Sequence, residues 1–391
     1  MHKIREIHEY PPISTLASRW KDEMDLVFLD SSLENRLGRY SIIGRKPYQK
    51  LVLSDDGFFV NGEKQETAFE DYLRTYLKAH PDVNESDLPI VSGAMGYFTY
   101  DYGRQKEKIV TRHPKEVDMP DVILCFYDNF IIEDHQEKRF YLVANGQTEA
   151  VDTLLDDVEN LVAETYLMWK NGQIPETKAD HSEIKITPNF TKEAYKQAVK
   201  DMIDYIVEGD IYIANMTQHL TVESGRAPYD VFCSLRRDNP SPFGGYLNYE
   251  DLQIVSASPE RFLQMRDGVV ATRPIKGTRK RGATKEEDAA MRKELEESDK
   301  DKSELLMIVD LERNDLNRVC VPGSVKVTEM YSIETYATVF HLVSEVQGRL
   351  AEGKNVADLL QAAFPGGSIT GAPKLRAAVR RTAQASGTGI G

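Results

Sequence analysis

A single lysine between a proline and a glycine lies in a strongly basic segment. Lys276 stands in Arg273–Arg281, which reads RPIKGTRKR. Nearby positive charge and partial burial both disfavour an ammonium ion, so we expect the pKa of Lys276 to fall below its ordinary value of roughly 10.4. An uncharged lysine is a nucleophile or a base. The alternative is a solvated basic loop, in which the lysine only anchors an anion.

An acid lies within reach of this lysine if two strands pair in one particular register. Residues 260–265 and 269–274 flank a predicted hairpin turn. A two-residue turn places Glu260 and Lys276 on opposite faces. A three-residue loop with left-handed Gly268 shifts the pairing by one, so that Lys276 faces Ser258 and Glu260 shares its face. We expect the three-residue loop, because it brings the acid and the lysine into one pocket.

A second carboxylate lies on a predicted helix over 302–310. Glu304 shares a stripe with Ile308 and Leu311, at i+4 and i+7. A buried carboxylate is costly unless it meets a cation. That cation is either an arginine such as Arg313 or Mg²⁺, which commonly binds through one or two carboxylates. A helix rotated away from this register would leave Glu304 at the surface.

A lone histidine and a glycine-rich segment complete the set of candidates. His341 lies in an apolar stretch, which favours an ordinary core histidine over a catalytic one. Residues 365–374, PGGSITGAPK, precede a helix that Pro373 can open. Their free backbone N–H groups suit a carboxylate or phosphate, and a plain glycine-rich turn is the alternative. The segment is not a nucleotide P-loop, because Ala372 stands where the lysine should follow.

The elements that must position these residues change in character along the chain. Helices are expected at about 66–79 and 148–170, and a further helix begins after Thr191, whose side chain can cap it. The second half mixes strands and helices. Candidate strands in the first half are 27–29, 51–53, 58–60, 122–127 and 140–143.

Composition excludes several classes of protein. The chain has 391 residues, 41% of them hydrophobic, and a net charge of −14, which argues against nucleic-acid binding. No apolar run long enough for a membrane span or signal peptide occurs, and the three scattered cysteines indicate reduced thiols, so we expect a cytoplasmic protein. The polar stretch 171–188 predicts a boundary between an N-terminal region, 1–175, and a catalytic domain, 180–391.

Taken together, the motifs of residues 190–376 closely resemble the chorismate-utilising family, which includes the first components of anthranilate synthase and aminodeoxychorismate synthase. FLDS at 28–31 and GRYSIIG at 38–44 extend the likeness into the N-terminal half. The resemblance implies an α+β chorismate-binding fold with a β-sandwich-like core flanked by helices. The other matching stretches are NPSPF (239–243), SASPERF (256–262), RPIKGTRKRG (273–282), ELLMIVDLERNDL (304–316), PGSVKV (322–327), HLVS (341–344) and FPGGSITGAPKLRA (364–377).

One residue separates two branches of that family. The aminodeoxychorismate branch carries PIKGT, as this chain does, whereas anthranilate synthases usually have alanine at the position of Lys276. The resemblance implies that Lys276 attacks C2 of chorismate while the C4 hydroxyl leaves. Ammonia then adds at C4 and expels the lysine, so that one difficult substitution becomes two easier ones. The product would be 4-amino-4-deoxychorismate, on the route to 4-aminobenzoate and folate.

The resemblance also implies roles for other residues. Glu260 would be the general acid and base, and His341 would assist at the C4 oxygen. Glu304 would be one ligand of Mg²⁺, which would hold the ring carboxylate. Ammonia would come from a separate glutaminase (amidotransferase) subunit. The carboxylates of chorismate would be bound by Gly277, Thr278, Ser368, Thr370 and Gly371.

The chain departs from the family pattern in two places. After Arg376, members continue into a helix and further strands that supply a second Mg²⁺ ligand, whereas this chain reads AAVRRTAQASGTGIG and stops. We therefore expect an incomplete catalytic domain after about 376, with C-terminal strands missing and little synthase activity from the chain alone. Members usually carry glutamine at the position of Ile213, and isochorismate and salicylate synthases carry a lysine that activates water. Ile213 disfavours water addition and leaves the delivery of ammonia open.

Two other interpretations stay open. The chain could be an anthranilate synthase component I, which places the amine at C2 and eliminates pyruvate. It could also be a catalytically inactive fragment that only binds a glutaminase or a small ligand. Lys276 argues against the first, and the C-terminal departure favours the second. The sequence leaves open whether tryptophan binds near FLDS in the N-terminal half.

Overall fold

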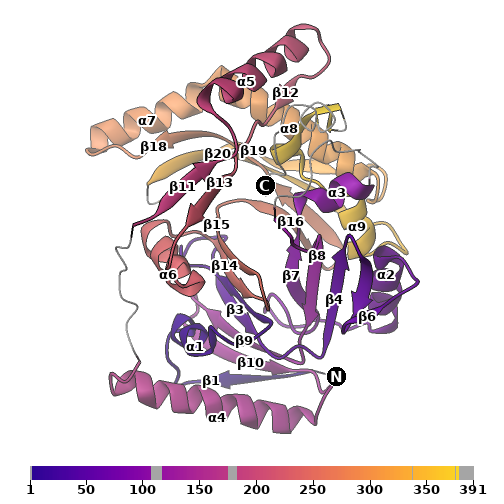
Figure 1. Ribbon diagram of the computed structural model, residues 1–391, viewed down its shortest axis with the longest axis vertical. Coiled ribbons are helices and arrows are strands. Elements are labelled where there is room, and N and C mark those ends of the chain that lie inside the picture. Colours follow the sequence, from indigo (N-terminus) through magenta and orange to yellow (C-terminus); the bar gives the residue numbers. More distant parts are fainter. Residues whose placement is uncertain (1, 107–116, 175–182, 337, 375, 378–391) are drawn as a thin grey trace. The chain divides into compact units, whose positions relative to one another are not determined.

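The computed structural model describes residues 2–106, 117–174, 183–336, 338–374 and 376–377 (Figure 1). The chain forms two compact units that alternate along the sequence. The first unit contains Met1–Phe98, Met119–Ile186 and Val222–Pro259. The second unit contains Thr99–Asp118, Thr187–Thr221 and Glu260–Gly391. β14 and β15 return to the sheet that contains β2, so the first unit includes chain on both sides of the polar stretch at 171–188.

The first unit is built on two antiparallel sheets. Its larger sheet has the strand order β1 (Lys3–Ile7), β10 (Arg139–Ala144), β9 (Asn129–Asp134), β3 (Tyr40–Gly44), β2 (Leu26–Asp30), β14 (Phe243–Asn248) and β15 (Gln253–Ser258). The smaller sheet has the order β6 (Glu63–Lys64), β5 (Gly57–Val60), β4 (Gln49–Ser54), β8 (Val122–Phe126) and β7 (Ala94–Phe98). The helices of this unit are α1 (Ile13–Trp20), α2 (Phe69–Ala79), α4 (Val151–Lys170) and α6 (Pro228–Asp238).

Strand β2 shows how the larger sheet is buried on both faces. Leu26 and Phe28 belong to a core cluster with residues of α1, α4 and α6. Val27 belongs to the opposite cluster, which includes Ile123 and Met95 of the smaller sheet. Successive side chains of a strand point to opposite faces, so one face of the larger sheet packs on helices and the other on the second sheet. The predicted β-sandwich-like core flanked by helices is therefore confirmed in this unit.

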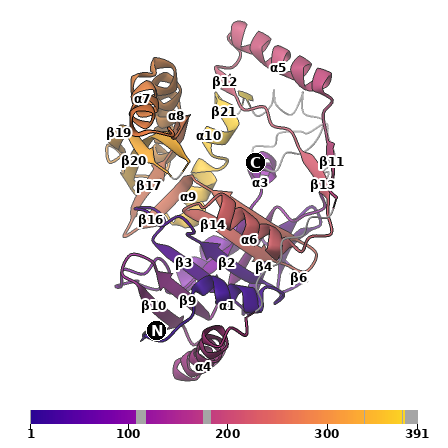
Figure 2. The ribbon, with the colours of Figure 1, turned by 90° about the vertical axis from the view of Figure 1, so that its left-hand side faces the viewer.

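The second unit has one main antiparallel sheet, with the order β16 (Arg261–Arg266), β17 (Val269–Arg273), β20 (Val339–Arg349) and β18 (Ile275–Lys280); β19 (Lys326–Thr335) also pairs with β20. A core cluster joins this sheet to α7 (Lys285–Glu297), α8 (Asp299–Asn317) and α9 (Val356–Ala363), and Figure 2 shows α7 and α8 beside β19 and β20. The remaining elements of the unit are α3 (Tyr100–Lys106), α5 (Lys192–Val207), α10 (Gly367–Thr370), β12 (Ile213–Ala214) and β21 (Gly371–Ala372).

Local expectations agree with these elements. Thr191 accepts a hydrogen bond from the Ala194 N–H and so caps α5, as its position predicts. The strands expected in the first half correspond to β2, β4, β5, β8 and β10. Two strands, β11 (Lys185–Pro188) and β13 (Leu220–Glu223), form a separate two-stranded sheet. Cys125 and Cys320 are buried free thiols, and Cys233 is half-buried.

Every helix in the described ranges is too short or too polar to cross a lipid bilayer. The C-terminal residues on which the expected departure from the family rests, 378–391, lie outside the described part of the chain.

Candidate active site

The hairpin of β16 and β17 turns differently from the sequence prediction. Arg266 pairs with Val269, so the turn has two residues, and Asp267 and Gly268 both adopt a positive φ. The predicted three-residue loop is therefore wrong. The one-residue shift arises instead from a bulge in β16, since Gln264 faces Ala271 but Arg261 faces Arg273. Asp267 accepts the left-handed conformation that a two-residue turn needs, which the prediction assigned to Gly268 alone.

The bulge brings Glu260 and Lys276 to the same place, as the prediction intended. The Lys276 amine donates to the Ser368 carbonyl oxygen at 3.2 Å. The Glu260 carboxylate accepts from the Ser368 side chain and from the Ile275 N–H at 3.4 Å, and it is electrostatically coupled to Lys276. Ser368 in α10 is therefore a common contact for an acid that directly precedes β16 and an amine from β18.

The Glu260 carboxyl has an altered acidity. Burial raises its pKa above the ordinary value, and the hydrogen bonds from Ser368 and Ile275 and the attraction of Lys276 only partly oppose this rise. A carboxyl whose pKa is raised holds its proton closer to neutral pH. Glu260 is therefore suited to give a proton to a leaving group and to take one back later.

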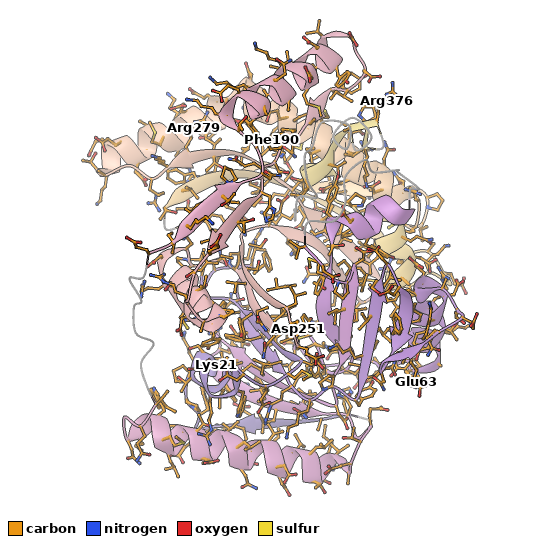
Figure 3. The ribbon with its side chains drawn as sticks, viewed as in Figure 1. Lys21, Glu63, Phe190, Asp251, Arg279 and Arg376 are labelled. Carbon is orange, nitrogen blue, oxygen red and sulfur yellow. The ribbon has the colours of Figure 1, made fainter. Side chains whose placement is uncertain are left out.

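The cations around Lys276 are compensated by acids. Arg279, labelled in Figure 3, pairs with Glu294 at 2.7 Å and with Asp301 at 3.1 Å. Arg281 pairs with Asp288 at 2.7 Å. The positive field that the sequence places around the lysine is therefore largely cancelled, and the basic segment is not a solvated loop, because it forms strand β18.

The pairing of β18 with β20 determines the positions of three predicted site residues, Thr278, His341 and Gly277. Thr278 faces His341, and the Thr278 hydroxyl lies 2.9 Å from His341 Nδ1. Burial lowers the pKa of His341, and the charge of Glu334 opposes this change only in part, so the imidazole is neutral at pH 7. Gly277 lies at an irregularity between Lys276 and Thr278, with a φ of +80°. A Cβ there would come within 2.9 Å of Asp301 and Leu295, so glycine is required.

The glycine-rich segment forms α10 and β21. The Thr370 hydroxyl donates to the Gly366 carbonyl at 3.0 Å and accepts from the Tyr100 hydroxyl at 3.2 Å, so its polar atom is engaged within the protein. Gly371 has a φ of +116°, and a Cβ there would lie 2.3 Å from the Ile213 carbonyl. This close approach lets β21 pair with β12, which contains Ile213.

Asn215 is a site residue that the sequence analysis did not single out. Its side-chain amide donates to the Ser368 carbonyl at 2.7 Å, the same oxygen that Lys276 contacts. The signal available in the sequence was its place two residues after Ile213, in a stretch already compared with the family. Asn215 helps to fix the backbone of α10 against the amine.

Glu304 is the partly exposed member of the predicted helical stripe that it shares with Ile308 and Leu311. Ile308 is buried, and Leu311 lies against Gly367, but the side chain of Glu304 is 33% exposed and 3.9 Å from Lys300. Arg313 instead pairs with Asp310, so the alternative of an Arg313 ion pair is wrong. Within the described residues, no group of three or more histidine, cysteine, aspartate or glutamate side chains could hold a metal. The role of Glu304 as a Mg²⁺ ligand stays a prediction.

A second carboxylate of α8 was missed by sequence reasoning. Glu312 is buried, and Thr272 of β17 contacts its carboxyl at 2.8 Å. Burial raises its pKa to about 8, with further contributions from the charges of Glu260 and Asp315. Asp315 itself pairs with Lys374 at 2.6 Å. The sequence shows only an acid within a charged stretch, and its burial depends on a strand distant along the chain.

Comparisons with known proteins agree with this geometry. The model of the chorismate binding enzyme family matches residues 30–379. Aminodeoxychorismate synthase component 1 of Bacillus subtilis (strain 168) is 36% identical over 360 residues, which cover 90% of this chain and 75% of that protein. Anthranilate synthase component 1 of Thermus thermophilus is also 36% identical over 360 residues, covering 89% of this chain and 75% of the relative.

A solved structure shows the same fold. The crystal structure of anthranilate synthase component I from Streptococcus pneumoniae TIGR4 superimposes with a TM-score of 0.76 at 27% identity, covering 91% of this chain and 79% of that one. The chain therefore belongs to the chorismate-binding enzyme family, whose members act on chorismate. Relatives with two different activities match at equal identity, so overall similarity does not distinguish amination at C4 from anthranilate formation.

Proposed function

We propose that this chain is an aminodeoxychorismate synthase component, which converts chorismate and ammonia to 4-amino-4-deoxychorismate through a covalent adduct on Lys276. The proposal rests on one observation: an amine and an acid both form hydrogen bonds with the same residue, Ser368. Lys276 donates to the Ser368 carbonyl, and Glu260, whose pKa is raised, accepts from the Ser368 side chain. A nucleophile beside a general acid is the arrangement that covalent substitution requires.

The proposed reaction has two displacements. In the first, the lone pair of the Lys276 amine forms a bond to C2, both conjugated double bonds of the ring shift by one position, and the C4–oxygen bond breaks as Glu260 protonates the departing hydroxyl, which leaves as water. In the second, ammonia bonds to C4, both double bonds shift back, and the C2–nitrogen bond breaks. Glu260 accepts the proton that the new ammonium loses, and the lysine amine is restored. The two steps together consume only chorismate and ammonia, release water, and restore both side chains.

The other predicted residues serve binding in this proposal. His341 is neutral and held by Thr278, so it can exchange a hydrogen bond with the C4 oxygen without adding charge. The backbone of Gly277 and the α10 and β21 residues Ser368, Thr370 and Gly371 would receive the substrate carboxylates. Thr370 would have to release an existing hydrogen bond to do so, because its hydroxyl is engaged with Gly366 and Tyr100 and its backbone N–H donates to the Gly366 carbonyl.

Mg²⁺ enters the proposal only through Glu304. Mg²⁺ often binds through one or two carboxylates together with substrate oxygens, and Glu304 offers one partly exposed carboxylate. When bound, the ion would neutralise charge on a chorismate carboxylate. We route no step through it, since the described residues supply no complete set of ligands. Calorimetric titration of Mg²⁺ in the presence of chorismate tests this role: Glu304→Gln should weaken binding, whereas Asp310→Asn should not.

Ammonia is proposed to come from a separate glutaminase subunit. The relatives that match carry the designation component 1, which supports a two-component enzyme. If this is correct, ammonium salts support product formation without any second protein, and glutamine supports it only after an amidotransferase subunit is added. Equal use of glutamine by the chain alone would contradict the proposal.

The central experiment uses the purified chain with chorismate, Mg²⁺ and an ammonium salt. Liquid chromatography with mass spectrometry should detect 4-amino-4-deoxychorismate. Intact-mass analysis without ammonium should detect an adduct that is absent from Lys276→Ala. Detection of an adduct with slow turnover would agree with the expectation of little activity from this chain alone. If neither the adduct nor the product were detected, the proposed function would be refuted.

Anthranilate synthase activity is the second candidate, because a relative with that name matches at the same identity. It predicts a fluorescent product with the amine at C2 and release of pyruvate. Formation of anthranilate as the main product, with no mass adduct on Lys276, would favour this candidate over C4 amination.

A further inference from the structure

The buried carboxyl of Glu312 is not used by the proposed reaction, and its surroundings limit its protonation state. The Thr272 hydroxyl oxygen lies 2.7 Å from the Phe262 carbonyl oxygen and 2.8 Å from Glu312 Oε2. Both distances fit full O–H···O hydrogen bonds. A carbonyl oxygen only accepts, and a hydroxyl has one hydrogen. When Thr272 donates to Phe262, the bond to Glu312 therefore needs a proton that Glu312 supplies.

These contacts coincide with the bulge that aligns the proposed catalytic residues. Between the pairs Arg261–Arg273 and Gln264–Ala271, two residues of β16 face Thr272 alone. A bulge disrupts the strand ladder locally. The Thr272 bond to Phe262 spans this irregularity, and Glu312 supports it from α8. Glu260 and Lys276 both lie beyond the Arg261–Arg273 pair, since Glu260 directly precedes Arg261 and Lys276 comes after Arg273.

We propose that Glu312 is a protonated positioning residue: its carboxyl donates to Thr272, Thr272 donates to the Phe262 carbonyl, and this chain holds the bulge that aligns Glu260 with Lys276. The role in alignment rests on the proposed function of those two residues. The protonation of Glu312 is a separate claim that does not depend on it.

The charges around Glu312 come from several elements. Glu260 precedes β16, Asp315 lies one turn along α8, and Lys374 follows β21. Burial and the two acids favour the protonated carboxyl, whereas a hydrogen bond donated by Thr272 and the charge of Lys374 favour the ionised form, and Lys374 is itself paired with Asp315. Ionisation of the Glu312 carboxyl in alkaline solution would remove the proton that it donates to Thr272 and would add a negative charge near Glu260. The alignment should then weaken as the pH rises through this range.

Infrared spectroscopy tests the protonation directly. At pH 7 the carboxylic-acid carbonyl band of the intact chain should decrease in Glu312→Gln and persist in Asp310→Asn, whose exposed side chain pairs with Arg313 on the same helix. An unchanged acid band in Glu312→Gln would show that Glu312 is ionised and would overturn the proposal. This readout needs no substrate, so it remains decisive even if the chain proves not to aminate chorismate.

The positioning role is tested by the rate of adduct formation on Lys276. Thr272→Ser keeps the hydroxyl, whereas Thr272→Val has a similar shape without it. We expect Val to slow the adduct by about 10- to 100-fold relative to Ser, since small misplacements of reacting groups have effects of this order. Glu312→Gln retains a donor and should be faster than Glu312→Leu. It should also lack the alkaline decrease of the parent chain. The positioning role would be overturned if Thr272→Ser and Thr272→Val formed the adduct at equal rates. It would also be overturned if the rate of adduct formation in Glu312→Gln fell in alkaline solution as it does in the parent chain.

Discussion

Arg273 and Lys276 belong to the same basic segment, but their surroundings differ. Arg273 is fully buried, and its guanidinium contacts Glu329 at 2.5 Å, Glu334 at 2.8 Å and Glu345 at 3.1 Å. Lys276 is half-buried and donates to a carbonyl oxygen, and its charge acts on the carboxyl of Glu260. The carboxylates around Arg273 make it a structural cation. Lys276 contacts neutral atoms and a carboxyl of raised pKa, which leaves its amine suited to chemistry.

Replacement of Lys276 should have the largest effect on rate. Lys276→Ala should remove the mass adduct and lower C4 amination by on the order of 10³-fold or more, because the nucleophile is lost. Its melting temperature should stay close to that of the parent chain, since the amine makes one hydrogen bond to the backbone. Parallel measurement of turnover and thermal unfolding checks both. An unaltered rate would remove Lys276 from the mechanism.

Replacement of Arg273 should have the opposite signature. Arg273→Met leaves acids of β19 and β20 without their buried cation, and breaking a buried ion pair in this way costs about 3–5 kcal/mol of unfolding free energy. Urea unfolding followed by circular dichroism measures this loss. Arg266→Met is the matched control, because Arg266 on β16 is exposed and lies 3.9 Å from the carboxylate of Asp267. A similar small change in both variants would contradict the comparison.

Gly277 directly follows Lys276 in β18, so a change in its backbone conformation would affect the same strand. Gly277→Ala adds a Cβ within 2.9 Å of Asp301 and Leu295 and retains a φ of +80°. We expect a loss of about 2–4 kcal/mol, from left-handed strain and overpacking together. Gly268→Ala has a φ of +73° and nothing within 4 Å of the added Cβ, so it isolates the strain alone at about 1–2 kcal/mol. Thermal unfolding should rank the variants in that order.

The pH dependence of stability should reveal Glu312. Its pKa rises from 4.5 in the unfolded chain to about 8 in the folded protein. Between these values the folded state binds more protons, so stability falls as the pH rises, by up to about 1.4 kcal/mol per pH unit. Glu312→Gln cannot titrate and should lack this contribution. Urea unfolding of both proteins at pH 5 to 8 measures the difference in slope, and parallel slopes would argue against a raised pKa.

Locally encoded features could be predicted from the sequence. Thr191 caps α5 through its own backbone neighbours, and β2, β4 and β5 follow short apolar runs bounded by turns. Lys276 and Glu260 could be named because the family motifs contain them. His341 and Thr278 could be named in the same way, although only the pairing of β18 with β20 shows that they contact each other.

Features that depend on distant parts of the chain could not be predicted. The burial of Glu312 requires Thr272, which comes from another element, and a helical pattern alone does not identify that neighbour. The bulge in β16 shifts the register without any glycine in that strand, so a prediction based on turn residues placed the shift at Gly268. The compensation of Arg279 depends on α7 and α8, which turns an expected positive field into paired charges.

The bulge in β16 has a consequence for insertions and deletions. One extra residue lies between the pairs that Arg261 and Gln264 make with β17. Deleting Leu263 would restore a regular ladder, and because side chains alternate along a strand, Glu260 would then project from the opposite side of the sheet. Loss of one hydrophobic residue within β16 would thus misdirect an acid that no point substitution at that position could move.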